Sequence, residues 1–208
     1  KNKPINITKS NINWGIISVV NSKKKSILNY SNINFGGLKN KAIINNKHFS
    51  GMVNFFYSDV EINNSIFSNA SIEDSINIKN SSYKINNTKV INNDSDGFDG
   101  DWSDGHISNS IFQNNKNDGI DISGSKVTIE KSSLISNGDK SISVGEDSKV
   151  IIENSDISDS VYGVVSKDLS YVLIKNTIFN NNLFAIAAYR KKPLFGGGSI
   201  KLDKNKLS

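Results

Sequence analysis

The sequence lacks cysteine altogether and has only two prolines and one methionine in its 208 residues. Without cysteine the chain has no disulfide framework, no thiolate metal site and no cysteine nucleophile. Proline this scarce excludes collagen-like and polyproline structures. No hydrophobic run approaches the roughly 18 residues that a membrane-spanning helix needs, so we expect no membrane span.

Three residue types dominate instead: 32 Asn, 32 Ser and 30 Ile together make up 94 of 208 residues, or 45 %. Asn and Ser are poor helix formers, and the β-branched Ile favours strands. The 36 % of hydrophobic residues is enough to build a core, and the length suits one domain. The composition therefore predicts an all-β protein.

From Asp74 onward the chain divides without gaps into blocks of 22 residues, which begin at positions 74, 96, 118, 140 and 162, with a partial block from 184. Upstream the spacing is looser, although the fragments SNINW (10–14) and SNINF (31–35) lie 21 residues apart. The third position of each block is hydrophobic: Ile76, Phe98, Ile120, Ile142, Val164 and Ile186. The twelfth position is hydrophobic too: Ile85, Ile107, Ile129, Ile151 and Leu173.

Within a block, hydrophobic residues alternate in runs of about four or five, separated by Gly, Asn, Asp and Ser, which favour turns. This pattern predicts a parallel β-helix solenoid of about nine 21–23-residue coils, each with three short strands. We expect one domain over residues 1–208, with irregular coils over 1–73 and regular ones over 74–195. A leucine-rich repeat is the nearest alternative, but it requires a Leu-x-x-Leu-x-Leu consensus, and the chain has few leucines.

Two further features follow from a solenoid. The Asn pairs 92–93, 114–115 and 180–181 fall at one coil position, where stacked amides hydrogen-bond along the rod. Neither end of the chain has an amphipathic capping helix, and an uncapped solenoid exposes hydrophobic side chains and strand edges. We therefore expect flanking domains in a longer chain.

Charge is segregated along the sequence. Residues 1–95 hold 12 lysines against 5 acidic residues (+7), residues 96–161 hold 5 against 13 (−8), and residues 162–208 hold 8 basic residues against 2 acidic ones (+6). An acidic band in the middle of the rod disfavours binding to a nucleic acid duplex. The aromatic residues are not interleaved with lysine as in single-strand binders, so we expect no nucleic acid partner.

The first strand of each block holds the candidate site. Because strand side chains alternate, positions two, four and six should point outward. Position four stacks Asn77, Asp99, Asp121, Ser143, Val165 and Ala187, and position six stacks Lys79, Asp101, Ser123, Gly145, Lys167 and Tyr189. Position two is small throughout, which predicts a shallow groove: Ser75, Gly97, Gly119, Ser141, Gly163 and Ala185.

Three outward carboxylates should then lie close together. Asp99 and Asp121 are one coil apart, about 4.8 Å between backbones, and Asp99 and Asp101 are about 6.6 Å apart on one strand. Such a cluster either holds a cation or keeps a proton on one carboxyl. We predict that Asp99, Asp101 and Asp121 are calcium ligands, since calcium prefers several oxygen ligands. Similar carboxyl separations also serve glycosidases.

Other residues nearby have simpler interpretations. Asp96-Gly97 and Asp118-Gly119 are predicted to be turn residues, because Asp caps turns and Gly takes positive φ. Lys140 stacks over Asp118 as a plain ion pair. Trp102, next to the acidic residues, is either a platform for a sugar ring or a loop-packing residue.

The repeat length and stacking from 74 to 190 resemble the right-handed parallel β-helix of the pectin-lyase-like superfamily. That resemblance implies a polysaccharide lyase, hydrolase or uronate epimerase that binds a glycan along the outward face of the first strand, with calcium held by acidic residues and Lys or Arg as base. It implies catalytic roles for Asp99, Asp121, Lys167 and Arg190. Substrate-binding residues would be Lys79, Trp102, Tyr189 and Lys191.

The sequence departs from two patterns of that superfamily, because it lacks both the Asn-Thr-Asp, Asp-Asp and Gly-His-Gly set of polygalacturonases and the Asp-Pro-His-Asp run of alginate epimerases. Two hypotheses therefore stay open. The chain is either a calcium-assisted enzyme acting on an acidic glycan or a non-catalytic surface module such as an adhesin or spacer. In both cases we expect it outside the cell or at the cell surface.

Overall fold

The computed structural model describes residues 3–37, 42–44 and 46–207, and it folds them into 27 strands. The first sheet contains β2 (Ile17–Val20), β7 (Gly51–Phe56), β10 (Asp74–Lys79), β13 (Asp96–Asp101), β16 (Ile120–Ser123), β19 (Lys140–Gly145), β22 (Tyr162–Lys167) and β25 (Phe184–Tyr189). The second sheet contains β3 (Ser26–Asn29), β8 (Val60–Asn63), β11 (Tyr83–Asn86), β14 (Gly105–Ser108), β17 (Lys126–Glu130), β20 (Lys149–Glu153), β23 (Tyr171–Lys175) and β26 (Ser199–Asp203).

The third sheet contains β1 (Ile5–Ile7), β4 (Ser31–Asn34), β9 (Ile66–Ser68), β12 (Lys89–Ile91), β15 (Ile111–Gln113), β18 (Ser133–Ile135), β21 (Asp156–Ser158), β24 (Ile178–Asn180) and β27 (Lys206–Leu207). A separate antiparallel hairpin pairs β5 (Ala42–Ile44) with β6 (Lys47–Phe49). The described residues include no helix that is long and hydrophobic enough to cross a membrane.

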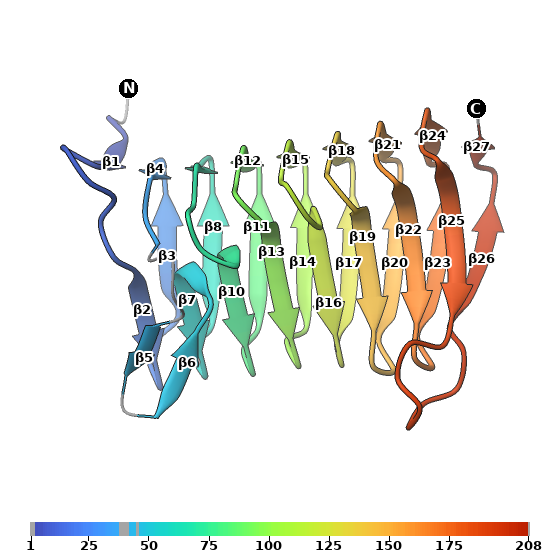
Figure 1. Ribbon diagram of the computed structural model, residues 1–208, viewed down its shortest axis with the longest axis horizontal. Coiled ribbons are helices and arrows are strands. Elements are labelled where there is room, and N and C mark those ends of the chain that lie inside the picture. Colours follow the sequence, from blue (N-terminus) through green and yellow to red (C-terminus); the bar gives the residue numbers. More distant parts are fainter. Residues whose placement is uncertain (1–2, 38–41, 45, 208) are drawn as a thin grey trace.

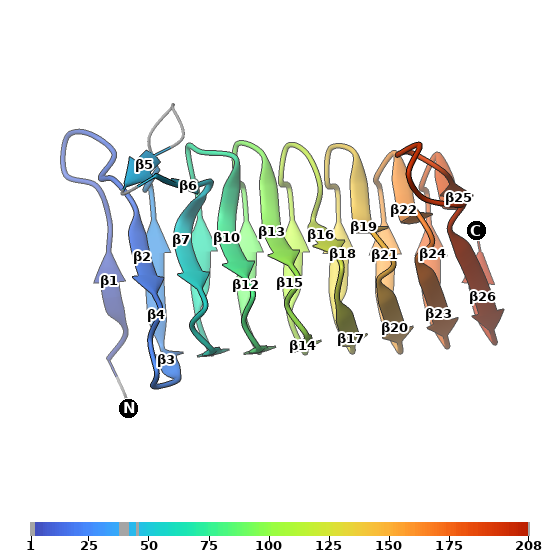
Figure 2. The same cartoon turned by 90° about the horizontal axis from the view of Figure 1, so that it is seen from below.

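Each coil contributes one strand to each of the three sheets, and neighbouring coils pair in parallel (Figures 1 and 2). Eight complete three-strand coils follow β1, which begins the first turn of the solenoid. The predicted fold, a parallel β-helix with three strands per coil, is therefore confirmed, and the predicted nine coils are close to the observed number.

The 22-residue register is confirmed in the first sheet, where Ile76, Phe98 and Ile120 stack directly over one another. In the second sheet it shifts by one residue after β17, since Ile129 pairs with Ile152 and not with Ile151. The corner before β20 has two consecutive residues with positive φ, Glu146 and Asp147, which leave one extra residue in that corner. Ile151 and Leu173, at the twelfth position of their blocks, are therefore only half-buried, and Ile152 and Ile174 occupy the inward column.

The three corners of the coil explain the abundance of Asn and Ser. A corner typically has one residue in the left-handed region followed by a polar residue that points inward, as in Asn80-Ser81, Asn109-Ser110 and Asn114-Asn115. Asn tolerates positive φ better than most residues. The predicted Asn ladder is confirmed at 92–93 and 114–115, but its later member is the pair 181–182, one residue beyond the prediction.

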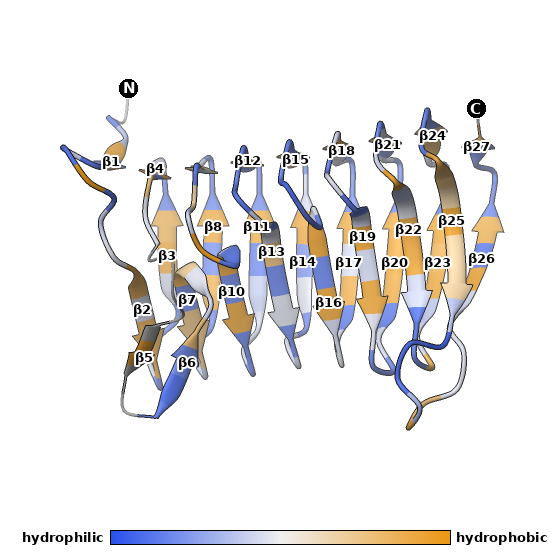
Figure 3. Ribbon diagram, viewed as in Figure 1, coloured by the Kyte–Doolittle hydropathy of each residue, from blue (hydrophilic) through white to orange (hydrophobic). Residues whose placement is uncertain are grey.

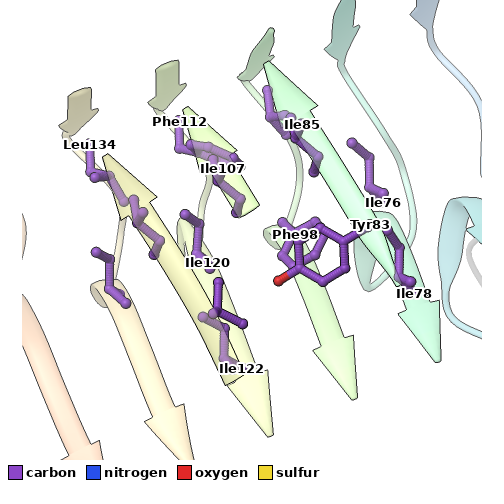
Figure 4. Close-up of a cluster of buried hydrophobic side chains, with 14 of the residues drawn as sticks. Ile76, Ile78, Tyr83, Ile85, Phe98, Ile107, Phe112, Ile120, Ile122 and Leu134 are labelled. Carbon is purple, nitrogen blue, oxygen red and sulfur yellow. The ribbon is translucent and has the colours of Figure 1, made fainter. Parts of the chain in front are cut away.

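Hydrophobic and polar residues alternate along many of the strands (Figure 3). The core is a column of hydrophobic side chains inside the coil (Figure 4). Tyr83 and Phe98 pack with their ring centroids 5.0 Å apart, and Gly100 and Gly105 make room for them. A Cβ on Gly105 would lie 2.2 Å from the Tyr83 ring, and one on Gly100 would lie 2.9 Å from Phe98. These two rings therefore fill the core directly beneath the outer face of β13.

Two segments stand at the ends of the first sheet (Figure 1). Near β7, Phe49 of the hairpin stacks on Phe56 with a centroid distance of 5.0 Å. After β25, the segment 190–198 packs against the corner between β22 and β23, where Asp168 Oδ1 accepts hydrogen bonds from the backbone N–H groups of Lys191 and Lys192, both at 2.7 Å. The part of the sheet from β10 to β22 lies between these two segments.

Candidate functional site

The outer face of the first sheet brings together three of the predicted residues. Asp99 lies between Asn77 and Asp121 in the parallel register, and Asp101 lies next to Lys79. Phe98 and Gly100 are buried inside the coil, so Asp99 and Asp101 point outward as the alternation requires. The predicted stacking of Asp99 with Asp121 is therefore confirmed.

A second acidic column borders the same face, and two of its members, Asp96 and Asp118, were predicted to be turn residues. Asp74 begins β10 and pairs in register with Asp96, which begins β13. Asp96 Oδ1 accepts a hydrogen bond from the Asp118 backbone N–H at 2.9 Å, and Asp118 Oδ1 accepts one from the Lys140 backbone N–H at 3.0 Å. The signal for this column was visible in the sequence, since three successive blocks begin with Asp.

The small residues at position two do not line a groove, so that prediction is wrong. A Cβ on Gly97 would lie 2.8 Å from the Asn115 amide nitrogen, and one on Gly119 would lie 2.8 Å from that of Asn137. Both amides belong to the buried Asn ladder, so position two faces the interior. The strand departs from simple alternation there, and positions one, four and six share the outer face.

Burial and mutual repulsion raise the pKa of four carboxyls on this face, those of Asp74, Asp96, Asp99 and Asp118, from the ordinary value of 3.8. Burial is the main cause in every case, and neighbouring carboxylates add to it. The pKa of Asp96 rises to about 8, that of Asp74 to about 7, and that of Asp118 to about 6. Burial, together with the charges of Asp74, Asp101 and Asp121, raises the pKa of Asp99 well above its usual range. The face therefore holds protons near neutral pH.

Two lysines bracket the acidic residues. Lys79 Nζ lies 2.8 Å from Asp101 Oδ2; burial lowers its pKa, but the hydrogen bond and charge of Asp101 outweigh burial and raise it. On the other side, Lys167 Nζ donates a hydrogen bond to Ser143 Oγ at 2.7 Å, and Ser143 pairs in register with Asp121. Gly145, between Lys167 and the acidic coils, leaves the path of this side chain open.

Several buried oxygens on this face have no hydrogen-bond donor among the described residues. They are Asp121 Oδ1, Asn77 Oδ1 and Asp74 Oδ2. The Asn77 side-chain amide donates to Asp99 Oδ2 at 2.6 Å, so its free oxygen belongs to the same cluster. Carboxylate and amide oxygens are the donors that calcium prefers. Within the described residues, however, no group of three or more His, Cys, Asp or Glu side chains is preformed to hold a metal ion.

The remaining predicted residues lie away from the acidic cluster. Trp102 follows Asp101 at the corner and is 57 % exposed. Tyr189 pairs with Lys167 at the end of β25. Arg190 and Lys191 follow β25 and are exposed, and Lys191 contacts Asp168 through its backbone. The predicted ion pair between Lys140 and Asp118 is present at 3.5 Å, and Lys140 also pairs with Asp139.

Comparison with solved structures shows the same fold in three polysaccharide- or phage-related proteins. Pectate lyase Pel9A matches with a TM-score of 0.60 at 14 % identity, over 99 % of this chain and 67 % of the lyase. The A-module of mannuronan C-5 epimerase AlgE4 from Azotobacter vinelandii matches at 0.54 and 12 %, over 97 % and 76 %. Tailspike protein 2 from Escherichia coli O157:H7 bacteriophage CAB120 matches at 0.55 and 12 %, over 94 % of this chain and only 30 % of the tailspike.

No curated protein sequence matches the chain. The family model described as "Right handed beta helix region" matches residues 74–208, which is well over half of the sequence and includes all the regular coils. The chain belongs to the right-handed β-helix family.

Proposed function

We propose that the outer face of the first sheet, from β10 to β22, binds an acidic polysaccharide outside the cell and, with calcium, acts on its uronate units. The observation that carries this proposal is the arrangement of six aspartates between two lysines, in which Asp74 and Asp121 each have a buried oxygen without a hydrogen-bond donor among the described residues. Like charges placed this close oppose folding, and a bound cation would relieve the repulsion when the carboxyls are ionised.

A polysaccharide suits the shape of this face. Columns of side chains run along the rod, and from β10 to β19 position four presents a polar or charged group on every coil, about 4.8 Å apart: Asn77, Asp99, Asp121 and Ser143. A polymer of sugar units laid along this stretch would meet a polar group at each step. Pectate lyase and mannuronan epimerase share the fold, which favours a glycan ligand over other polymers.

Calcium would supply the missing positive charge. Asp99 and Asp121, with the Asn77 amide oxygen, are the donors on this face, and Asp101 is available if it leaves Lys79. When bound, the ion would polarise a uronate carboxylate and so acidify the neighbouring carbon-bound proton. Lys79 and Lys167 are the basic groups next to the cluster. Lys79, whose pKa Asp101 raises, would stay charged and neutralise a substrate carboxylate, so Lys167 is our candidate to accept that proton. Arg190 and Lys191 lie outside the proposed site.

Calorimetry tests the binding. The protein should bind calcium at pH 8, and oligomers of galacturonate, mannuronate or guluronate should bind more tightly with calcium than with a chelator. Asp121→Asn should weaken both interactions about tenfold or more, because the substitution removes a carboxylate ligand. The control is Asp156→Asn, a change of the same chemistry at an exposed position of the third sheet.

The chemistry is tested on the same oligomers. A lyase would form unsaturated uronate ends, which absorb in the ultraviolet, and an epimerase would exchange the carbon-bound proton with deuterium from the solvent. Binding without either reaction would favour the alternative, a non-catalytic surface-recognition module. Failure of every acidic glycan to bind, with or without calcium, would overturn the proposal.

A further inference from the structure

Trp102 occupies an unfavourable position in the coil. It lies at the corner after β13 with a φ of 47°, and its side chain is 57 % exposed. At the same corner, the coil before has Asn80 and the coil after has Gly124, two residue types that adopt positive φ at low cost. A large exposed side chain gains nothing from this backbone conformation. Its presence therefore calls for a reason other than folding.

The neighbouring coil provides a seat for the indole ring. A Cβ on Gly124 would lie 2.6 Å from Trp102 Cδ1 and 2.7 Å from Nε1. Glycine at this position therefore allows one side of the indole to pack against the backbone of the next coil. The seat fixes the ring in place while the rest of the ring stays open to solvent.

A polar hollow of about 290 Å³ adjoins the ring. Its walls come from three successive coils, and the lining residues are Asp59, Asn80, Ser81, Ser82, Trp102 and Asp104. Asp59 Oδ1 accepts a hydrogen bond from the Ser82 backbone N–H, and Asp104 Oδ1 accepts one from that of Lys126, both at 2.8 Å. These bonds fix both carboxylates. Their Oδ2 atoms have no partner among the described residues and remain able to accept.

We propose that this hollow, the Trp102 ledge, is a binding subsite for a neutral pyranose unit of the polysaccharide. The apolar face of the sugar stacks on Trp102, and its hydroxyls donate to the carboxylates of Asp59 and Asp104. The inference rests on the proposed function, because it takes the ligand to be a glycan. It adds a neutral sugar at the corner next to the acidic face.

The lining chemistry distinguishes among sugars. Two carboxylates repel a uronate, so the subsite disfavours the acidic unit expected on the neighbouring face. The walls contain donors as well as acceptors, since the side-chain amide of Asn80 and the hydroxyl of Ser82 can both donate. Sugar hydroxyls use both kinds of partner, so a neutral, hydroxyl-rich ring can satisfy the donors and the acceptors together. The two carboxylates would also attract the ammonium group of an amino sugar, so the chitosan hexamer is the ligand that tests this assignment.

Tryptophan fluorescence tests the proposal. Wild-type protein and Trp102→Phe are titrated with cellohexaose, mannohexaose, hexagalacturonate and chitosan hexamer, and the difference between the two proteins isolates the signal of Trp102 from that of Trp14. A neutral hexamer should shift the Trp102 emission. Trp102→Ala should weaken its binding about tenfold. Asp59→Asn and Asp104→Asn should weaken it too, because amide oxygens are weaker acceptors than carboxylates.

Two matched variants separate a binding role from a folding role. Trp102→Asn installs the residue of the preceding coil and should raise the melting temperature while it removes binding. Gly124→Ala keeps the indole but displaces it from its seat, so binding should weaken although tryptophan is present. A melting temperature lowered by Trp102→Asn, or binding unchanged in Trp102→Ala, would overturn the inference, as would a response to chitosan or hexagalacturonate alone.

The outcome is separable from that of the proposed function. Loss of uronate binding in Asp121→Asn with normal binding of a neutral hexamer supports the Trp102 ledge as an independent subsite. Binding of uronates by the acidic face, with no Trp102-dependent binding of any neutral hexamer, overturns the ledge and leaves the proposed function intact.

Discussion

Two columns of stacked polar side chains have the same spacing along the solenoid but opposite effects on its stability. Inside the coil, Asn93, Asn115 and Asn137 stack every 22 residues; at the border of the outer face, Asp74 and Asp96 stack in the same way. In the inner column, each side-chain amide donates to the oxygen of the next, at 2.7 and 2.9 Å. A carboxylate has no such donor, so the outer column stacks charge on charge.

The same repeat stabilises the folded chain at one position and destabilises it at another, because the stacked groups differ in their hydrogen-bonding capacity. An amide is both donor and acceptor, so identical amides along the rod complete one another. Ionised carboxylates only accept, so identical carboxylates repel and take up protons, which is why their pKa values rise. The acidic column opposes the folding of its own coils, and a position that burdens the fold is where function is expected.

The largest change in stability is expected when an amide of the inner column is replaced by a carboxylate. Asn115→Asp should lower the free energy of unfolding by about 3–5 kcal/mol at pH 7, because it places an unpaired charge inside the coil. Part of the loss should return near pH 4, where the new carboxyl is protonated. Urea denaturation at both pH values measures the difference.

Asn92→Asp is the matched control for that experiment. Asn92 precedes the inner column, has a φ of 58° and is exposed, and Asp tolerates this conformation nearly as well as Asn. We expect a change of less than about 0.5 kcal/mol. Equal losses in the two variants would contradict the view that the amide ladder is the source of the stability.

The outer column predicts an unusual pH dependence of stability. In the folded chain the pKa values of Asp74, Asp96 and Asp118 are about 7, 8 and 6, whereas an unfolded aspartate titrates near 3.8. Between about pH 4 and pH 8 the native state therefore binds more protons than the unfolded state. Stability from this column is complete below pH 4 and is lost as the pH rises to 8.

Asp96→Asn should reduce that dependence, by on the order of 2 kcal/mol between pH 5 and pH 8, since the amide cannot ionise. The measurement is the free energy of unfolding across this range, without divalent cations. Asp156→Asn, exposed on the third sheet, should leave the slope unchanged. A stability that rises with pH in the wild-type protein would contradict the raised pKa values.

The fold was predictable because the same residue types recur at the same positions of successive blocks. Hydrophobic residues at position three and turn residues at the corners fix the coil length and the parallel register, and these place Asp99 over Asp121 and Lys79 beside Asp101. The extra residue at the corner with Glu146 and Asp147 was not predictable from the block length. A shorter corner before β22 restores the 22-residue spacing in the first sheet, so the blocks keep the same length.

The site was predictable only in part, because strict alternation does not hold along the whole first strand. Position two faces the Asn ladder, so Asp74, Asp96 and Asp118 reach the outer face, although the Asp-Gly sequences at 96–97 and 118–119 suggested turns. The reach of Lys167 back to Ser143 depends on the gap that Gly145 leaves. The path of such a side chain depends on the residues of neighbouring coils. The alternation within a single strand therefore does not predict it.

The smallest change in stability is expected at Tyr83, which lies in the core beneath the acidic face. Its hydroxyl is buried without a partner among the described residues, and burial, with the charges of Asp104 and Asp99, raises its pKa. Tyr83→Phe should therefore raise the free energy of unfolding by about 1 kcal/mol, because it removes an unsatisfied group and keeps the ring. Tyr83→Leu, which loses the packing on Phe98, should lower it by about 1–3 kcal/mol. Destabilisation by Tyr83→Phe would mean that the hydroxyl has a hydrogen-bond partner in the folded chain.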